Sequence, residues 1–330
     1  MTNIPAHTFF YQLLENPLVC VISSGLLMPS GIDHAVSLAA GRRCLIIVQP
    51  AWQVGRDVCE FIEVTSEIQR HHPYLSFLFI CPSIKETELL LQAGLRASHV
   101  HKNAFIDDSV FRIMDISCKR YPAIHIANIE KFKRHYLAWG IEDIAVITYN
   151  FRIEEDLTEL SGYKKLGFAN FEYSTKIKNL KPELTPHEVA KIINISNCGL
   201  ILSESEGANN ASTEYLLCGV PVVSTLSIGG RDEFFTSNNS LIVDPNPDAV
   251  ERAVNFFNSS KVDPHAIRDE VMIKIRKHRK LFLELLSAYS NQNLFLEATE
   301  NYWHHIFKNK LRTIVPNIGT NNCVNFLNKS

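Results

Sequence analysis

The segment Ser203–Thr225, SESEGANNASTEYLLCGVPVVST, decides the fold of this chain. Leu200–Ser203 predicts a strand, the residues after it a polar turn and a short helix, and Val220–Ser224 a second, buried strand. Glu206 falls in the turn, whereas Glu214 falls inside the helix with its side chain tilted towards the helix N-terminus. Both carboxylates are therefore expected at the carboxyl ends of parallel strands, where open α/β sheets bind their ligands.

The spacing of this segment resembles the donor-binding motif of the retaining GT-B glycosyltransferases of the family-four, or group 1, type. That motif runs Glu-Gly, a short loop, a second Glu, a small residue or Cys, and then Gly, Pro, Val and Val. Glu206-Gly207, Glu214 and Cys218–Val223 fall in register with it, while Ala-Asn-Asn at positions 208–210 replaces the usual aromatic-Gly pair. The alternative is a helix N-terminus whose acidic residues only complement the helix dipole.

The resemblance implies a role for each residue of the motif. Glu206 is the expected catalytic residue, hydrogen-bonded to the donor sugar near the reacting carbon. Glu214, an acceptor-only group when ionised, is expected to bind the ribose hydroxyls. The helix start offers backbone N–H groups to the donor, and a glycine lets the backbone approach closely. The donor-binding residues expected there are Gly207, Ala208, Asn209 and Asn210.

A basic segment follows the first strand of the second predicted series. Ala127-Asn128-Ile129 replaces the Gly-Arg-Leu of the family, so Asn128 stands where the family has Arg. Lys133 takes the place of the family Lys that contacts the diphosphate, with Arg134 or Lys131 as substitutes. Cations are needed there because charge builds on the leaving phosphate. The alternative is a solvated basic segment without a ligand.

Two glycine-containing loops complete the expected donor site. Gly229 and Gly230 match a family Gly-Gly-x-x-Glu pattern beside the donor, and Arg231 is expected to reach a phosphate or to pair with Asp232 on the surface. In the first part of the chain, Gly31 is what remains of the family's Gly-Gly loop facing the phosphates. An ordinary strand-to-helix loop is the alternative for Gly31.

Length and composition favour a two-domain α/β protein. The chain has 330 residues, 46% of them hydrophobic and 21% charged, which fits globular domains and excludes a disordered chain. The net charge of −2 gives no indication of nucleic-acid binding. The eight cysteines include no Cys-x-x-Cys pair, which favours buried free thiols over a zinc site. No metal-ligand spacing is present, so neither a metal nor a cofactor is expected.

Strand and helix patterns alternate along most of the chain, which predicts parallel sheets built from βαβ units. The expected fold is GT-B: two Rossmann-like domains with a cleft between them and a reduced N-terminal domain. The predicted acceptor domain covers residues 1–117, the nucleotide-sugar-binding domain residues 118–295, and a crossover helix with a frayed tail residues 296–330. The crossover helix itself is expected at Leu296–Leu311.

The expected function is a metal-independent retaining glycosyltransferase that uses a nucleotide-diphosphate sugar, with a UDP-sugar as the favoured donor. A non-catalytic nucleotide-sugar-binding or partner subunit is the alternative, and a GT-B epimerase is disfavoured by the glutamate pair. The acceptor is left open among glycans, lipid-linked glycans, small molecules and proteins. The N-terminus lacks the features of a signal peptide, which predicts a cytoplasmic protein. The basic run Ile273–Lys280 leaves open a peripheral contact with the inner face of the membrane, against a solvated helix face.

Overall fold

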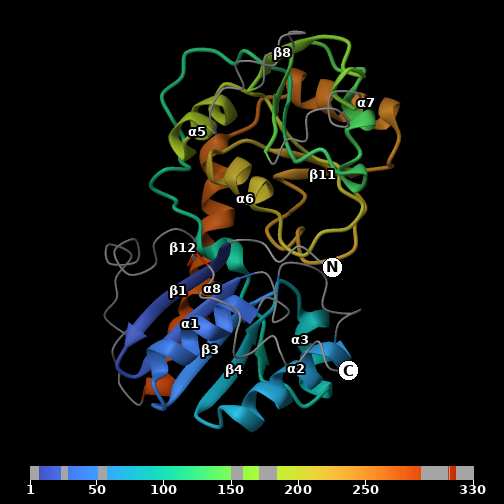
Figure 1. Cartoon of the computed structure of the whole chain (residues 1–330). Helices are drawn as coiled ribbons and strands as arrows, with labels where there is room; N and C mark the ends of the chain where they lie inside the picture. The colour runs from blue at the N-terminus through green and yellow to red at the C-terminus, as the bar shows by residue number, and fades with distance from the viewer. Residues whose placement is uncertain are drawn as a thin grey trace. The chain divides into compact units, whose positions relative to one another are not determined.

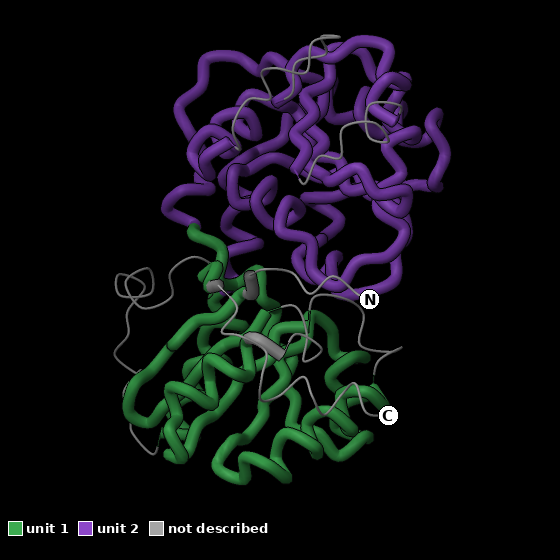
Figure 2. Tube along the Cα trace, in the orientation of Figure 1, with its two compact units in different colours: residues 1–107, 276–330 green, residues 108–275 purple. Residues whose placement is uncertain are grey.

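Two compact units make up the chain in the computed structural model, which describes residues 7–23, 29–50, 58–149, 159–170, 184–290, 311 and 313–316. Unit 1 comprises residues 1–107 and 276–330, and unit 2 comprises residues 108–275 (Figure 2). Each unit is built around its own sheet, so the chain is a mixed α/β protein, as its alternating sequence pattern predicts.

The sheet of unit 1 has the strand order β12-β1-β2-β3-β4-β5. Strands β2 to β5 are parallel, while β1 pairs antiparallel with both β2 and β12. The strands are β1 (His7–Glu15), β2 (Leu18–Ser23), β3 (Cys44–Gln49), β4 (Leu75–Ile80), β5 (Ala97–Ser98) and β12 (Thr313–Pro316).

Helices cover both faces of this sheet. Successive strand residues point to opposite faces, so each central strand contributes side chains to two cores. Cys20 and Ile46 join a core with three helices, while Val21 and Ile47 join a second core with Phe282 of a fourth helix. Figure 1 shows the first helix in front of the sheet. The covering helices are α1 (Pro29–Ala39), α2 (Val58–His71), α3 (Ile84–Gln92) and α8 (Pro264–Ser290).

The parallel strands of unit 1 agree with the sequence prediction, but the antiparallel edge does not. The mixed sequence of β1 shows no clear alternation, and β12 forms in a segment that the sequence predicts to be frayed. Strand β5 is only two residues long and is soon followed by a 3₁₀ turn, η2 (Lys102–Phe105), which His101 caps by accepting the Asn103 N–H at 3.2 Å.

The sheet of unit 2 is entirely parallel among the described residues, with the order β11-β10-β9-β6-β7-β8. The chain starts in the centre at β6, builds outwards to β8, and returns to β9 on the other side of β6. The strand order therefore reverses between β6 and β9, which is the position where open α/β sheets bind ligands. The strands are β6 (Ile124–Ile126), β7 (Ile144–Ile147), β8 (Leu166–Ala169), β9 (Gly199–Ile201), β10 (Val222–Thr225) and β11 (Ser240–Val243).

Three helices of unit 2 are α5 (Pro186–Asn194), α6 (Asn210–Leu217) and α7 (Pro247–Ser259). Helix α6 is the most buried of them, with every residue from Ala211 to Leu217 withdrawn from water. The side chain of Tyr215 crosses under β9, and its hydroxyl oxygen accepts the Ile126 N–H of β6 at 2.9 Å. Gly199 leaves the room that this ring needs.

Helix α8 carries the chain from unit 2 into unit 1, since the units divide between Ile275 and Arg276. The crossover helix predicted from the sequence at residues 296–311 lies outside the described residues, except for Leu311.

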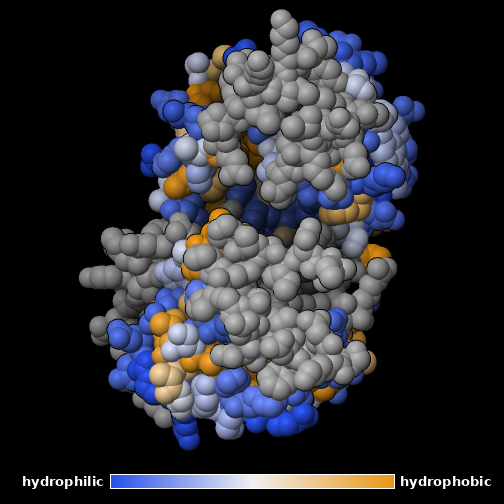
Figure 3. Space-filling model, in the orientation of Figure 1, coloured by the Kyte–Doolittle hydropathy of each residue, from blue (hydrophilic) through white to orange (hydrophobic). Residues whose placement is uncertain are grey.

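On the face drawn in Figure 3, the described residues are mixed in polarity, with hydrophilic residues around small apolar patches. Within the described part of the chain, no helix combines the length and the apolar character needed to cross a membrane.

Substitution Gly199→Ala should destabilise the protein by about 1–3 kcal/mol, because the added Cβ would overlap the buried ring of Tyr215. Urea unfolding measures the change. Gly140→Ala is the matched control, since the nearest atom to its Cβ is the flexible Glu251 carboxylate at 3.7 Å. Equal stabilities of the two variants would contradict the packing described for Tyr215.

Candidate functional site

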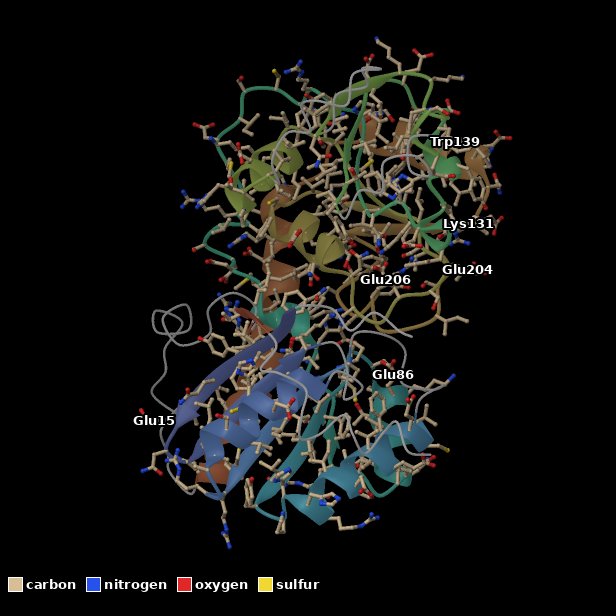
Figure 4. The ribbon with its side chains drawn as sticks, viewed as in Figure 1. Glu15, Glu86, Lys131, Trp139, Glu204 and Glu206 are labelled. Carbon is tan, nitrogen blue, oxygen red and sulfur yellow. The ribbon has the colours of Figure 1, made fainter. Side chains whose placement is uncertain are left out.

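The candidate site lies where β6 and β9 end, at the point of strand-order reversal in unit 2. Beyond these strands the two chain segments stay together, because the Glu204 N–H donates to the Phe132 carbonyl at 2.9 Å. In the view of Figure 4, Lys131, Glu204 and Glu206 lie along the lower part of unit 2, whereas Trp139 lies farther up. Segments far apart in sequence thus meet at the edge predicted for the site.

The Glu206 carboxylate is held by three side chains. Its Oε1 pairs with the Lys133 ammonium, and its Oε2 accepts hydrogen bonds from Ser203 Oγ at 2.5 Å and Asn209 Nδ2 at 2.7 Å. The Lys133 and Glu206 side chains are only 6% and 14% exposed. The geometry therefore fixes both carboxylate oxygens of Glu206 through the protein's own side chains.

These partners keep Glu206 ionised. Burial alone raises the pKa of this carboxyl, but the charge of Lys133 and the hydrogen bonds from Lys133, Ser203 and Asn209 outweigh it, so the pKa lies below its ordinary value.

Lys133 reaches Glu206 because the chain turns sharply after β6. A 3₁₀ turn, η3 (Lys131–Lys133), is followed by Arg134 in the left-handed region at φ 52° and by η4 (His135–Ala138). This turn buries Lys133 against the ring of Phe132, 5.2 Å from its centroid, and leaves Lys131 exposed. Lys133 is thus brought to the site, whereas Lys131 is not.

Arg134 also lies at this edge, but its guanidinium is bound to the ends of two strands. Its Nε donates to the Leu202 carbonyl at 2.6 Å and its Nη2 to Thr225 Oγ1 at 2.7 Å. Burial lowers the pKa of this group from its ordinary value. Arg134 therefore braces the exits of β9 and β10.

Arg231 differs from the sequence expectation of a phosphate contact or a surface ion pair. Its side chain has no exposed surface and donates to Ser203, Ser224, Thr225 and Asp232, the last at 2.8 Å. A guanidinium enclosed in this way has no face left for a phosphate. Arg231 instead has a structural role: its hydrogen bonds connect Ser203, after β9, to Ser224 and Thr225 of β10.

The predicted glycine loop after β10 lies directly against the Glu206 loop. The Glu206 N–H donates to the Ile228 carbonyl at 3.0 Å, and Ser205 and Ile228 form a parallel bridge. Gly229 has φ +121°, and a Cβ there would overlap the Glu206 carbonyl oxygen. Gly229 is required by this close backbone contact, and Gly230 beside it is buried.

The start of α6 agrees with the sequence prediction. Asn209 is the N-cap residue: its Oδ1 accepts the Ser212 N–H at 3.0 Å, while its Nδ2 binds Glu206. Ala208 and Asn210 are half-buried beside it, and Gly207 is buried. Glu214, one turn into α6, is 7% exposed. Asn209 therefore joins the Glu206 loop to the start of α6, the buried helix that carries Glu214.

Tyr149 is a site residue that sequence reasoning missed. It follows β7, and its hydroxyl oxygen accepts the Asn128 N–H. Burial raises the pKa of Tyr149 to about 12, and the charges of Glu206 and Glu214 add to this effect. Both glutamates thus act on one hydroxyl group. The available signal in the sequence was an aromatic residue directly after a predicted buried strand.

His125, in β6, is a buried core residue. Tyr163 Oη lies 3.2 Å from His125 Nδ1 and 2.9 Å from His135 Nδ1, and the second ring nitrogen of His135 lies 2.9 Å from the Asn128 carbonyl oxygen. Burial lowers the pKa of His125 well below its ordinary value, so His125 is neutral in this core.

Gly31 belongs to unit 1, as the third residue of α1. A Cβ there would lie 3.0 Å from Ile22 of β2, so close helix–strand packing accounts for this glycine.

Comparisons with known proteins agree with this site. Residues 170–277 match the family model of glycosyl transferases group 1, a range that includes Glu206, Glu214, Gly229 and Gly230. The matched range lies almost entirely within unit 2. A search of curated proteins found no match.

Solved structures extend the likeness to both units. The chain is similar to HepE from Anabaena in complex with UDP-glucose, at 14% identity and a TM-score of 0.57, over 81% of this chain and 78% of HepE. It is also similar to sucrose-phosphate synthase from Thermosynechococcus elongatus, at 12% identity and a TM-score of 0.55, over 81% and 74% of the two chains. TarM matches at 11% identity with a TM-score of 0.54, over 79% and 58%. These likenesses show that the chain has a GT-B fold.

Glu206 should make stability depend on pH in the acidic range. Because its pKa is lower in the folded than in the unfolded chain, the ionised carboxylate contributes stability that is complete above its ordinary pKa and is lost as the pH falls through the lowered value. Urea unfolding of wild type and Glu206→Gln, between about pH 6 and pH 3, should show the larger loss in the wild type. Parallel losses in the two proteins would contradict this prediction.

Proposed function

We propose that this protein is a retaining glycosyltransferase that uses a nucleotide-diphosphate sugar as donor. The observation that carries the proposal is the convergence of Glu206, Glu214 and Lys133 at the strand-order reversal of a group 1 domain. The two carboxylates suit the hydroxyl groups of a sugar and a ribose, and the ammonium suits a diphosphate. The paired glutamates support retention over inversion.

A UDP-sugar is the proposed donor class. HepE, which shares the fold, has been solved with UDP and with UDP-glucose.

In the proposed transfer, the bond between the anomeric carbon and the leaving phosphate oxygen breaks as the acceptor oxygen bonds to the same face of that carbon. The acceptor proton passes to the departing phosphate oxygen, so charge and atoms balance. Glu206 holds the donor sugar hydroxyls, and Lys133 stabilises the charge on the diphosphate. We propose that the reaction needs no metal ion, because the protein supplies this cation itself.

The acceptor hydroxyl is left open within this proposal. Peripheral contact with an anionic membrane surface would involve only part of the basic run of α8, because Lys274, His278 and Arg279 bind within the protein. We propose that any such membrane contact is made by the exposed residues Arg276, Lys277 and Lys280.

Substitution Glu206→Gln should lower the rate of sugar transfer at least about a hundredfold, because the neutral amide cannot replace an ionised acceptor for the donor sugar hydroxyls. Transfer of radiolabelled sugar from the donor measures the change. Glu204→Gln, an exposed position two residues away, is the matched control and should keep the wild-type rate. Wild-type turnover by the Glu206→Gln variant would remove Glu206 from the chemistry.

A non-catalytic nucleotide-sugar-binding subunit is the second candidate. Asn128 replaces the family Arg, Arg231 is enclosed, and Lys133 is already paired, so the cationic charge offered to a diphosphate is small.

Donor hydrolysis separates the two candidates. The enzyme should release UDP slowly from a UDP-sugar without an acceptor, and Glu206→Gln should abolish this release. Binding of the UDP-sugar with no release beyond the buffer blank would favour the binding subunit.

A further inference from the structure

Tyr149 is anchored firmly at the exit of β7. The side chain of Asn170, just beyond β8, clamps the backbone of the preceding residue: its Oδ1 accepts the Thr148 N–H at 2.9 Å and its Nδ2 donates to the Thr148 carbonyl at 2.7 Å. Thr148 and Asn170 are both buried. The position of Tyr149 is thus fixed by two neighbouring strand ends.

The hydroxyl of Tyr149 extends from β7 across the exit of β6. It accepts the Asn128 N–H, and it lies within electrostatic range of Glu206 at the exit of β9 and Glu214 in α6. The Tyr149 side chain therefore contacts the exit of β6 from the exit of β7, and it lies close enough to both glutamates to sense their charge. Since burial and, after it, the two carboxylates raise the pKa of Tyr149, the hydroxyl stays protonated and can donate a hydrogen bond.

The residue as a whole remains 42% exposed, although its hydroxyl lies in this polar cluster. An aromatic surface that is open to solvent beside two hydroxyl-binding carboxylates is typical of ligand sites, which combine an apolar wall with a few placed polar groups. Tyr149 carries no charge to offer a diphosphate. Its ring suits the flat and less polar part of a nucleotide sugar, the nucleoside.

Resting on the proposed function, we infer that Tyr149 is a donor-binding residue whose ring packs against the nucleoside of the nucleotide sugar. Asn170 positions Tyr149 by binding the backbone of Thr148, and the Asn128 N–H positions its hydroxyl group. It would complete a site in which Glu214 binds the ribose and Lys133 the diphosphate.

Isothermal titration of UDP into purified full-length protein tests this role. The variants are Tyr149→Ala, which removes the ring, and Tyr149→Phe, which keeps the ring and removes the hydroxyl. Phe256→Ala is the control, an aromatic of α7 in the same unit that is 53% exposed. Circular dichroism and thermal melting establish that each variant is folded.

The inference predicts that Tyr149→Ala binds UDP about tenfold more weakly or worse, that Tyr149→Phe stays within about threefold of wild type, and that Phe256→Ala is unchanged. Wild-type affinity in Tyr149→Ala, or equal losses in the Ala and Phe variants, would overturn the ring contact while leaving the proposed function intact. Absence of UDP binding by the wild type, with no other nucleoside diphosphate bound either, would overturn both.

Discussion

The site of unit 2 depends on the ion pair between Lys133 and Glu206. The pair joins two strand exits that are adjacent in the sheet but 73 residues apart in the sequence. Both side chains are almost withdrawn from water, where charges interact more strongly and where removal of one partner leaves the other uncompensated. Ser203 and Asn209 satisfy the second oxygen, and Asn209 also caps α6. Folding of the sheet edge and formation of the site are therefore one event.

The same arrangement limits the charge available to a ligand. Arg231 is enclosed beneath the Glu206 loop, and Arg134 braces the strand ends, so neither guanidinium is a simple phosphate receptor. A diphosphate at this edge would compete with Glu206 for Lys133. Such an exchange would release the glutamate towards the sugar at the moment when the cation meets the phosphate. Donor binding and arrangement of the carboxylate would then be coupled through a single ion pair.

Local sequence patterns predicted most of the parallel strands of both sheets, because short apolar runs alternate with helices and the central strands are buried on both faces. Spacing and turn chemistry likewise predicted that Glu206 lies in a turn, that a helix begins near Asn209 and that Glu214 lies inside that helix. The antiparallel edge of unit 1 was missed because β12 pairs with β1 across nearly the whole chain. Arg231 was misjudged because its enclosure depends on partners from two other strands, and burial of that kind leaves no local pattern.

A crystal structure of the protein with UDP bound tests the central claim most directly. The account predicts the diphosphate at the exits of β6 and β9, within hydrogen-bonding distance of Lys133 Nζ, and the ribose hydroxyls at the carboxylate of Glu214. UDP bound at any other edge of unit 2, with the Lys133–Glu206 pair undisturbed and no nucleotide near Glu214, would contradict it.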